Sequence, residues 1–302
     1  MEAFSKIAIV GLGLIGSSIA HAARRAGLAK EIAGHDASAD VLDRAAKIGF
    51  CDTLHADIGD AVDDAELVIL CAPVGAYKQI AQGIVEHLGK GTILSDVGSV
   101  KGAVIRDVGP FVPQDVHFIP AHPIAGTEFS GPEAGFASLF DGRWTILTPA
   151  PGSDTAAVEK LKAFWQGLGS QVDVMDSTHH DLVLAITSHL PHLIAYNIVG
   201  TAHDLEAVTE GEVIKYSASG FRDFTRIAAS DPTMWRDIFM NNRDAVLEVL
   251  GRFNEDLSQL QRAVRNGDGQ TLFDWFTRTR AIRRAIVDIG QDTAAPNFGR
   301  KS

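Results

Sequence analysis

The sequence predicts a doubly wound α/β domain followed by an all-α domain. Short β-rich runs alternate with helical patterns over the first 176 residues, whereas from Asp181 to Gly290 apolar residues recur at helical spacing with no convincing strand. Alternation of strands and helices indicates a parallel sheet with helices on both faces. A glycine-rich turn directly after the first β-rich run favours the same fold class.

Seven segments of the first part are predicted strands. They are residues 6–10, 31–36, 66–72, 91–96, 116–121, 143–149 and 171–176. Several are nearly continuous apolar runs, as expected of strands that are buried on both faces. Segments 14–27 and 155–169, which lie between strands, have helical patterns. We therefore assign residues 1–176 to the α/β domain.

The second part, residues 177–292, contains one long apolar stripe. The stripe runs from Trp235 to Val264, and either Ser230 or Asp231 can cap the helix that carries it. This spacing predicts a helix of roughly 30 residues, about 45 Å long. Such a stripe fits a dimer surface or a core helix equally well.

The composition is that of an ordinary soluble globular protein, with 46% hydrophobic and 22% charged residues. The formal net charge of −11 argues against nucleic acid or an anionic membrane surface as the main partner. No stretch comes close to the roughly 20 apolar residues of a membrane span, and the N-terminus lacks the pattern of a signal peptide. Cys51 and Cys71 lie in no CxxC or Cys/His spacing, which fits a reducing compartment, so we expect a cytoplasmic protein. Residues 293–302 are predicted to be a disordered tail.

A nucleotide-binding turn is predicted at Gly11, Gly13 and Gly16, which have Gly-x-Gly-x-x-Gly spacing. The turn follows a β-rich run and opens a helix, the context typical of Rossmann-type dinucleotide binding. Gly11 permits a tight turn, Gly13 lets the backbone approach a pyrophosphate, and Gly16 lets helix and strand pack closely. Leu14 and Ile15 begin the helix, whose free amides and partial positive charge suit phosphates.

Asp36 ends the second predicted strand, 20 residues beyond Gly16. An acidic side chain at this place accepts hydrogen bonds from the adenosine ribose hydroxyls. Residues 37–39 include no Arg or Lys that could bind a 2′-phosphate, so the sequence predicts NAD rather than NADP. Ala72 and Pro73, after the third strand, and Ser99, after the fourth, are further candidates for cofactor binding.

Polar residues also follow two consecutive later strands, in SDVGSVKG (95–102) and AHPIAGTE (121–128). Ligands of such sheets bind at the carboxyl ends of the strands, so these residues are expected to converge. They are Ser99, Lys101, His122, Thr127 and Glu128. Pro123 and Gly126 restrict the backbone around His122, although a lone loop histidine is also common at a surface or a helix cap.

Segment 185–197 has a helical pattern that contains Pro191. Because proline has no N–H to donate to the carbonyl four residues back, we expect the helix to kink and to leave Thr187 without that bond. A kink of this kind offers polar backbone groups to a ligand.

Four histidines lie on or near this segment, namely His179, His180, His189 and His192. His189 and His192 are three residues apart and share a helix face. No cysteine and no well-spaced carboxylate completes a set of metal ligands, so we predict no metal site. Contact with the substrate or the cofactor is the favoured interpretation.

Two arginines, Arg222 and Arg226, lie in a mixed polar and aromatic segment. Arginine is the usual residue for bidentate recognition of a carboxylate. Either could also lie on a solvated face or pair with Asp223, and for Arg222 that interpretation is favoured.

Together these motifs resemble the prephenate/arogenate dehydrogenase family of tyrosine biosynthesis. GLGLIGSS, SDVGSVK, HPIAGTE, SHLPH and GFRDFTRIAASDPTMW occur in the expected order along nearly the whole chain. The resemblance implies a Rossmann-type domain followed by a helical dimerisation domain, and hence a homodimer. It also implies oxidative decarboxylation of prephenate to 4-hydroxyphenylpyruvate, with NAD as the hydride acceptor.

The resemblance also assigns roles by position. His122 matches the catalytic histidine that hydrogen-bonds the ring hydroxyl of the substrate, and Ser99 matches a serine that shares this hydroxyl. Arg226 matches the arginine that binds a substrate carboxylate. The remaining implied pocket residues are His189, His192, Thr127, Glu128 and Trp235, the last contributed across the dimer in some members.

Three alternatives stay open on the sequence. The substrate could be arogenate, alone or beside prephenate, because the two differ only in a keto or amino side chain. A β-hydroxyacid or imine dehydrogenase would have a similar two-domain build. A nucleotide-sensing module without turnover is the third, and the joint presence of Ser99, His122 and Arg226 argues against it.

Overall fold

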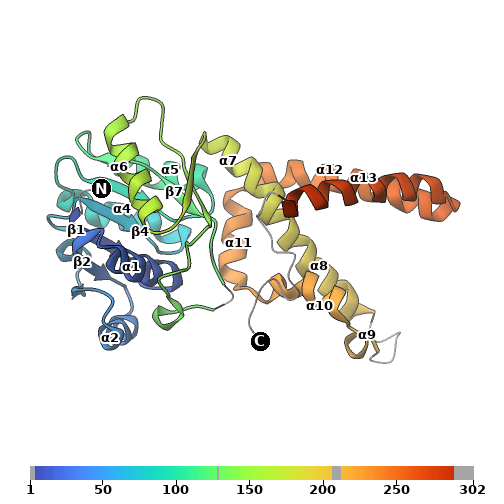
Figure 1. The fold of residues 1–302 in the computed structure, drawn as a ribbon, viewed down its shortest axis with the longest axis horizontal. Helices are drawn as coiled ribbons and strands as arrows, with labels where there is room; N and C mark the ends of the chain where they lie inside the picture. The colour runs from blue at the N-terminus through green and yellow to red at the C-terminus, as the bar shows by residue number, and fades with distance from the viewer. Residues whose placement is uncertain (1–3, 128, 206–211, 289–302) are drawn as a thin grey trace. The chain divides into compact units, whose positions relative to one another are not determined.

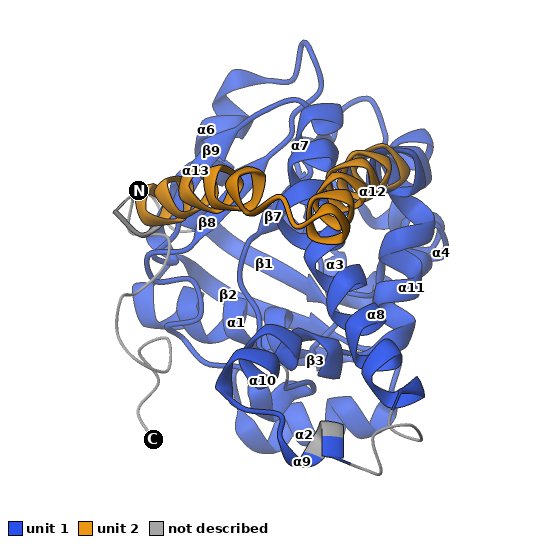
Figure 2. Ribbon diagram, turned by 90° about the vertical axis from the view of Figure 1, so that its right-hand side faces the viewer, with its two compact units in different colours: residues 1–246 blue, residues 247–302 orange. Residues whose placement is uncertain are grey.

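The chain folds into two compact units, residues 1–246 and 247–302 (Figure 2). The first unit contains both sheets, and the described part of the second is helical. The predicted domains, 1–176 and 177–292, are divided where the sequence pattern changes, whereas the compact units are divided at residue 246. The predicted division stays a prediction. The computed structural model describes residues 4–127, 129–205 and 212–288. The predicted tail, 293–302, lies outside these residues.

The main sheet has six parallel strands in the order β3-β2-β1-β4-β5-β6. Its strands β1, β2 and β4 are labelled in Figure 1. Each strand of the sequence prediction up to residue 121 contributes to it, and the short strand β3 was not predicted. The order reverses beside β1, which is where α/β sheets of this kind bind ligands. The bounds are β1 (Phe4–Val10), β2 (Ala29–His35), β3 (Thr53–His55), β4 (Leu67–Leu70), β5 (Ile93–Asp96) and β6 (His117–Phe118).

Side chains of the central strands alternate between two apolar cores. In β1, Ile7 and Ile9 lie in one core with residues of three helices, whereas Ala8 and Val10 lie in the other with residues of three more. This period of two buries both faces of each strand and explains the nearly continuous apolar runs. The first core includes α1 (Leu14–Ala26), α2 (Ala39–Ile48) and α6 (Thr155–Gly167), and the second includes α3 (Ile58–Val62), α4 (Tyr77–Ile84) and α5 (Lys101–Val108).

The predicted strand 116–121 is divided between two sheets. Ile119 still donates to the carbonyl of Leu94 in the main sheet, but Pro120 has no N–H and its carbonyl instead accepts from Thr148. The chain thereby enters a second sheet of order β7-β8-β9, antiparallel between its first two strands. Its strands are β7 (Ala121–Pro123), β8 (Trp144–Leu147) and β9 (Gln171–Val174).

A continuous helical run follows the second sheet. It consists of α7 (Ser177–Leu184), the π-helical segment η5 (Ala185–His189) and α8 (Leu190–Asp204). Pro191 lies in the first turn of α8, and the N–H of Leu190 donates to the carbonyl of Ala185. A widened π turn therefore accommodates Pro191 where the sequence predicted a kink.

By length and composition this run is apolar enough to cross a membrane, with a mean hydropathy of 1.5 over its best window. The prediction that no stretch approaches a membrane span was therefore wrong. The criterion tolerates the histidine, serine and threonine residues that interrupt the apolar positions here. The same run contains His180 and Asp181, whose buried side chains hydrogen-bond to residues of β7 and α5.

The predicted helix of roughly 30 residues is interrupted at Asn242. Its two parts are α11 (Pro232–Asn241), capped by the Asp231 carboxylate, and α12 (Arg243–Asn266). Asn242 leaves the helical region with φ −109° and ψ 33°, and its side chain is buried and hydrogen-bonded. The remaining helical elements are α9 (Glu212–Lys215), α10 (Ser219–Thr225), η6 (Arg226–Ala229) and α13 (Gly269–Asp288).

The burial of Phe164 in the first core predicts that its substitution lowers stability far more than substitution of an exposed phenylalanine. Phe164 is 0% exposed and lies edge-on to both Phe4 and Trp165, whereas Phe129 is 68% exposed. Phe164→Ala should lower the free energy of unfolding by roughly 3–5 kcal/mol. The matched Phe129→Ala should lower it by less than about 0.5 kcal/mol. Urea unfolding followed by circular dichroism measures both; equal losses would contradict this placement of the core.

Candidate active site

The glycine turn between β1 and α1 has the geometry of a nucleotide cradle. Gly11 has φ +102°, and a Cβ there would lie 2.7 Å from the carbonyl carbon of Cys71. A Cβ on Gly16 would lie 2.0 Å from the Gly11 carbonyl oxygen. By contrast, a Cβ on Gly13 would meet no atom within 4 Å. Gly13 therefore borders open space, which is what close approach of a pyrophosphate needs.

The start of α1 suits an anion. Gly13 is the N-cap and has no side chain to satisfy the amides of the first turn, including those of Leu14 and Ile15. No acidic residue lies in that turn. The helix dipole and the free amides therefore remain available for phosphate.

Asp36 is connected directly to the glycine turn. Its Oδ2 accepts from the N–H of Leu12 at 2.9 Å, and its Oδ1 accepts from the N–H of Ser38 at 2.9 Å. The carboxylate thus lies beside the turn at the carboxyl end of β2. Ala72 is also close, because a Cβ on Gly11 would lie 2.9 Å from the Ala72 nitrogen, and the exposed Pro73 follows it. The structure therefore brings the predicted cofactor residues together at one edge of the sheet.

The loop between β5 and α5 is fixed by a buried ion pair rather than by a ligand. Lys101 is fully buried, and its Nζ donates to Asp96 Oδ2 at 2.5 Å and to the Ala121 carbonyl at 2.6 Å. Asp96 Oδ1 in turn accepts from the N–H of Ala121 at 3.1 Å. Desolvation raises the pKa of Asp96 and lowers the pKa of Lys101, and their mutual attraction opposes both shifts. Lys101, which we expected to converge on the site, thus instead anchors β7 through the Ala121 carbonyl. Ser99 lies half-buried in the loop.

His122 on β7 lies at the end of a line of buried polar side chains. Its Nδ1 is 2.9 Å from His180 Nε2, and His180 Nδ1 is 2.8 Å from Asp181 Oδ1. Asp181 also accepts from the main-chain N–H groups that begin α5, at 2.8 Å each, from Lys101 and Gly102. Asp181 therefore occupies the positive end of α5 and connects it to α7.

The imidazole of His122 is held neutral. Desolvation, followed by the neighbouring His180, Lys101 and His189, lowers the pKa of His122 well below its ordinary value. Near pH 7 the ring therefore has one nitrogen without a proton. Since its Nδ1 is occupied by His180, Nε2 is the nitrogen left to meet a ligand.

His189 has a different environment. Its Nδ1 is 3.1 Å from the Asn242 side-chain nitrogen, which also donates to the Asp181 carbonyl at 2.8 Å. Its Nε2 is buried and has no hydrogen-bond partner among the described residues. Desolvation lowers the pKa of His189 to about 4. His189 is thus a buried neutral residue next to the site rather than a group that is open to a ligand.

His192, Trp235 and Arg226 form a second group in the same unit. The rings of His192 and Trp235 stack with centroids 3.6 Å apart and planes at 22°. Burial is the main cause of the lowered pKa of His192, and the positive charge of Arg226 contributes to it. Arg226 begins η6 and is exposed, whereas Arg222 lies near Asp223 with N–O 3.8 Å apart on a solvated face, as the sequence favoured.

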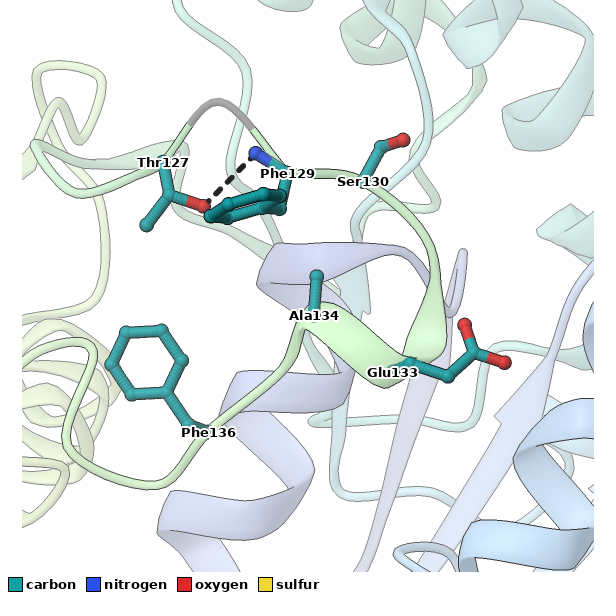
Figure 3. Close-up of a pocket in the computed structure, with 6 residues that line it drawn as sticks. All are labelled: Thr127, Phe129, Ser130, Glu133, Ala134 and Phe136. Carbon is teal, nitrogen blue, oxygen red and sulfur yellow. Dashed lines mark hydrogen bonds between the residues drawn. The ribbon is translucent and has the colours of Figure 1, made fainter.

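Thr127 lies in the loop after β7. Its Oγ1 accepts from the N–H of Phe129 at 3.2 Å, and Thr127 lines an open hollow of about 510 Å³ with residues in and around the short helix η4 (Pro132–Ala134) (Figure 3). The phenylalanine rings of Phe129 and Phe136 border this hollow, and none of the four histidines lines it. Glu128, predicted beside Thr127, lies outside the described residues.

The histidines do not form a metal site in the part of the chain that the structure describes, where no group of three or more possible ligands converges. Both nitrogens of His180 are engaged, by His122 and by Asp181. His179 is exposed. The histidine cluster is thus a hydrogen-bonded network.

Two family descriptions match most of the chain. "Prephenate dehydrogenase, nucleotide-binding domain" matches residues 19–174, and "Prephenate dehydrogenase, dimerization domain" matches residues 176–278. The chain belongs to the prephenate dehydrogenase family. The glycine turn precedes the first matched segment, so its assignment depends on the geometry above.

Similar proteins support the same family. A cyclohexadienyl dehydrogenase of Zymomonas mobilis is 41% identical over 95% of this chain and 97% of its own length. A prephenate dehydrogenase of Bacillus subtilis is 33% identical over 97% of this chain and 78% of its own. The Aquifex aeolicus prephenate dehydrogenase, solved with hydroxyphenyl propionate and NAD+, is 33% identical with a TM-score of 0.88 and covers 94% of this chain and 99% of its own. These findings confirm the family and the fold class predicted from the sequence.

The buried His189 predicts how the stability of this family member depends on pH. The unfolded residue binds a proton near pH 6.5 and the folded one only near 4, so the unfolded state binds more protons between these values. Stability should therefore fall as the pH drops through this window. His189→Gln should reduce the slope by about 1.4 kcal/mol per pH unit.

Urea unfolding at several pH values measures this slope. His179→Gln, which changes an exposed neighbour, is the matched control and should leave the slope unchanged. An unchanged slope in the His189→Gln protein would show that this residue titrates alike in both states.

Proposed function

We propose that this protein catalyses the NAD-dependent oxidative decarboxylation of prephenate to 4-hydroxyphenylpyruvate. Membership of the family confirms the predicted class, an NAD-dependent oxidoreductase, since a relative with 33% identity was solved with NAD+. The observation that carries the proposed mechanism is the position of His122 beyond the carboxyl ends of the main strands, with Nδ1 engaged and Nε2 left to accept a proton.

The residues present fit a dinucleotide. Open space over Gly13 and the uncapped start of α1 suit the pyrophosphate, and the Asp36 carboxylate suits the ribose hydroxyls. No lysine or arginine lies among residues 37–39, which favours NAD. When bound, NAD accepts hydride from the ring carbon that carries the substrate hydroxyl.

His122 supplies the matching proton acceptor. As hydride leaves, the hydroxyl-bearing carbon becomes electron-poor, and its O–H proton passes to His122 Nε2 as the carbonyl forms. Loss of carbon dioxide from the ring and a final proton transfer to the carbonyl oxygen give the phenol. Aromatisation drives this decarboxylation, so the chain need not provide an electron sink. The hydroxyl of Ser99, in the β5–α5 loop, is assigned to orient the substrate hydroxyl.

The substrate carries two carboxylates, and the protein has a net charge of −11, so a local cation must attract the substrate. Arg226 is assigned this role because it is exposed and close enough to lower the pKa of His192. His192 and Trp235, stacked beside it, form an amphipathic wall for the ring. His189 and Thr127 are assigned to the pocket on the family resemblance alone, as is Glu128, which lies outside the described residues.

We also infer that the protein is a cytoplasmic homodimer. The second family description is a dimerization domain, and the described helices of that region expose large apolar side chains. Those more than half exposed within residues 176–278 are Ile186, Leu205, Tyr216, Met240, Leu247, Leu257, Val264, Phe273 and Phe276. Pairing with a second copy would remove these side chains from water. No nucleic-acid or membrane partner is proposed.

Arogenate is the second candidate substrate. The relative with 41% identity is named a cyclohexadienyl dehydrogenase, and an Arogenate dehydrogenase of Synechocystis is 26% identical with a TM-score of 0.79 over 93% of this chain and 99% of its own. The remoter alternatives, a β-hydroxyacid or imine dehydrogenase and a sensing module without turnover, have no comparable support.

Steady-state kinetics with both substrates and both cofactors test the proposal. We expect NADH formation with prephenate and NAD, and a kcat/KM with NADP that is lower by at least tenfold. Asp36→Ala should raise the ratio of NADP to NAD use, because it removes the repulsion of a 2′-phosphate along with the ribose acceptor. No turnover of either cyclohexadiene would reject the proposal, and an unchanged cofactor ratio would reject the role of Asp36.

His122→Ala should lower kcat by roughly 10²–10⁴ with a small change in KM, because the proton acceptor acts in the transition state. His117→Ala, which changes a half-buried histidine on β6, is the matched control and should keep near-native kcat. Near-native turnover of the His122→Ala protein would remove His122 as the base.

A further inference from the structure

Asp181 is linked to two histidines through two different groups: to His180 directly, and to His189 through Asn242. Its carboxylate accepts from His180 Nδ1 at 2.8 Å, and its main-chain carbonyl accepts from the Asn242 side chain at 2.8 Å. The same Asn242 nitrogen lies 3.1 Å from His189 Nδ1. Asp181 is itself held in place by the N–H groups of Lys101 and Gly102.

The carboxylate fixes the proton positions along the first branch. A carboxylate only accepts, so His180 Nδ1 must carry a proton. Burial lowers the pKa of His180, so its ring is neutral near pH 7 and its Nε2 then has a lone pair. His122 Nδ1 must therefore donate to it, which leaves the lone pair of neutral His122 on Nε2.

The main-chain carbonyl of Asp181 fixes the proton positions along the second branch, Asn242 and His189. Here the imidazole carries its proton on Nε2 instead of Nδ1. Only the NH₂ group of Asn242 can face the Asp181 carbonyl, so the amide orientation is determined. Its second N–H points to His189 Nδ1, which must accept. Neutral His189 therefore has its proton on Nε2, and that nitrogen is buried without a partner among the described residues.

We infer that Asp181 is a positioning residue for the proposed reaction: through His180 it holds His122 as the Nδ1–H tautomer with a basic Nε2, and through Asn242 it holds His189 as the Nε2–H tautomer. The inference rests on the proposed function only for its effect on rate. Of these two rings, only His122 then offers a lone pair to the substrate hydroxyl. Besides burial, the charges of His180, Lys101 and His189 lower the pKa of His122, and its one side-chain hydrogen-bond partner among the described residues, His180, is no carboxylate that would favour its protonated form.

Asp181→Leu is the most direct test, because it removes both carboxylate oxygens with little change in side-chain volume. Without that acceptor, a proton on the buried His180 Nδ1 has no partner. The proton is then favoured on His180 Nε2, which reverses the proton order along the line. We expect His122 to change to the Nε2–H tautomer and kcat to fall by roughly 10²–10⁴, with KM changed by less than about threefold. Nitrogen-15 NMR of histidine-labelled holoenzyme with NAD and no substrate reports the tautomers directly.

The wild-type spectrum should show His122 with its proton on Nδ1 and His189 with its proton on Nε2. This NMR measurement needs no turnover, so its outcome does not depend on the identity of the substrate. A wild-type His122 with its proton on Nε2 would overturn the inference. So would an Asp181→Leu protein that keeps the wild-type tautomer or near-native kcat.

His180 provides a second pair of variants that leaves Asp181 and its contacts to α5 in place. The amide oxygen of His180→Gln can accept from His122 Nδ1, whereas His180→Leu cannot. We expect the Gln protein to retain a kcat at least tenfold above that of the Leu protein, and His179→Gln to behave as wild type. Equal kcat values of the Gln and Leu proteins would contradict positioning by hydrogen bond.

Discussion

The described site depends on one carboxylate placed at the start of one helix. The Asp181 carboxylate, which only accepts, satisfies the first amides of α5 and thereby joins the helical run after residue 176 to the parallel sheet. An unpaired buried carboxylate would be costly, so this contact both requires and fixes the approach of α7 to α5. The histidine network is arranged around that contact.

Two sets of polar contacts act on β7: one fixes its backbone, and the other orients the ring of His122. The Asp96–Lys101 pair hydrogen-bonds to the backbone of Ala121 and so fixes the backbone position of the next residue, His122. Beside β7, His180 determines how the ring of His122 is oriented. Because the two sets share the β5–α5 loop, a change in that loop would move the cofactor edge of the sheet and the proton acceptor together.

Much of this architecture could be predicted from the sequence, because the physical signals are local. Apolar runs with a period of two, and a glycine turn between strand and helix, fix the strands of the main sheet without knowledge of distant contacts. The exit of the chain at Pro120 and the interruption at Asn242 could not be predicted in this way. Both depend on partners far along the chain, Thr148 for one and Asp181 for the other. The same is true of His180 and Asp181, which in the sequence are only a polar pair on a helix; Asn242 left a signal, a polar residue inside an apolar stripe.

The π turn from Ala185 to His189 has a consequence for insertions and deletions in this chain. A π turn contains one residue more than the α-helical turn it replaces, and each residue of an α-helix adds about 100° of rotation. If the same residues formed a regular α-helix without losing one, everything after them would be rotated by about that angle. His192 would then face away from the Trp235 ring on which it stacks, while His180, ahead of the turn, would keep its place. Related chains that share this pocket geometry should therefore either keep the π turn or have one residue fewer in this segment.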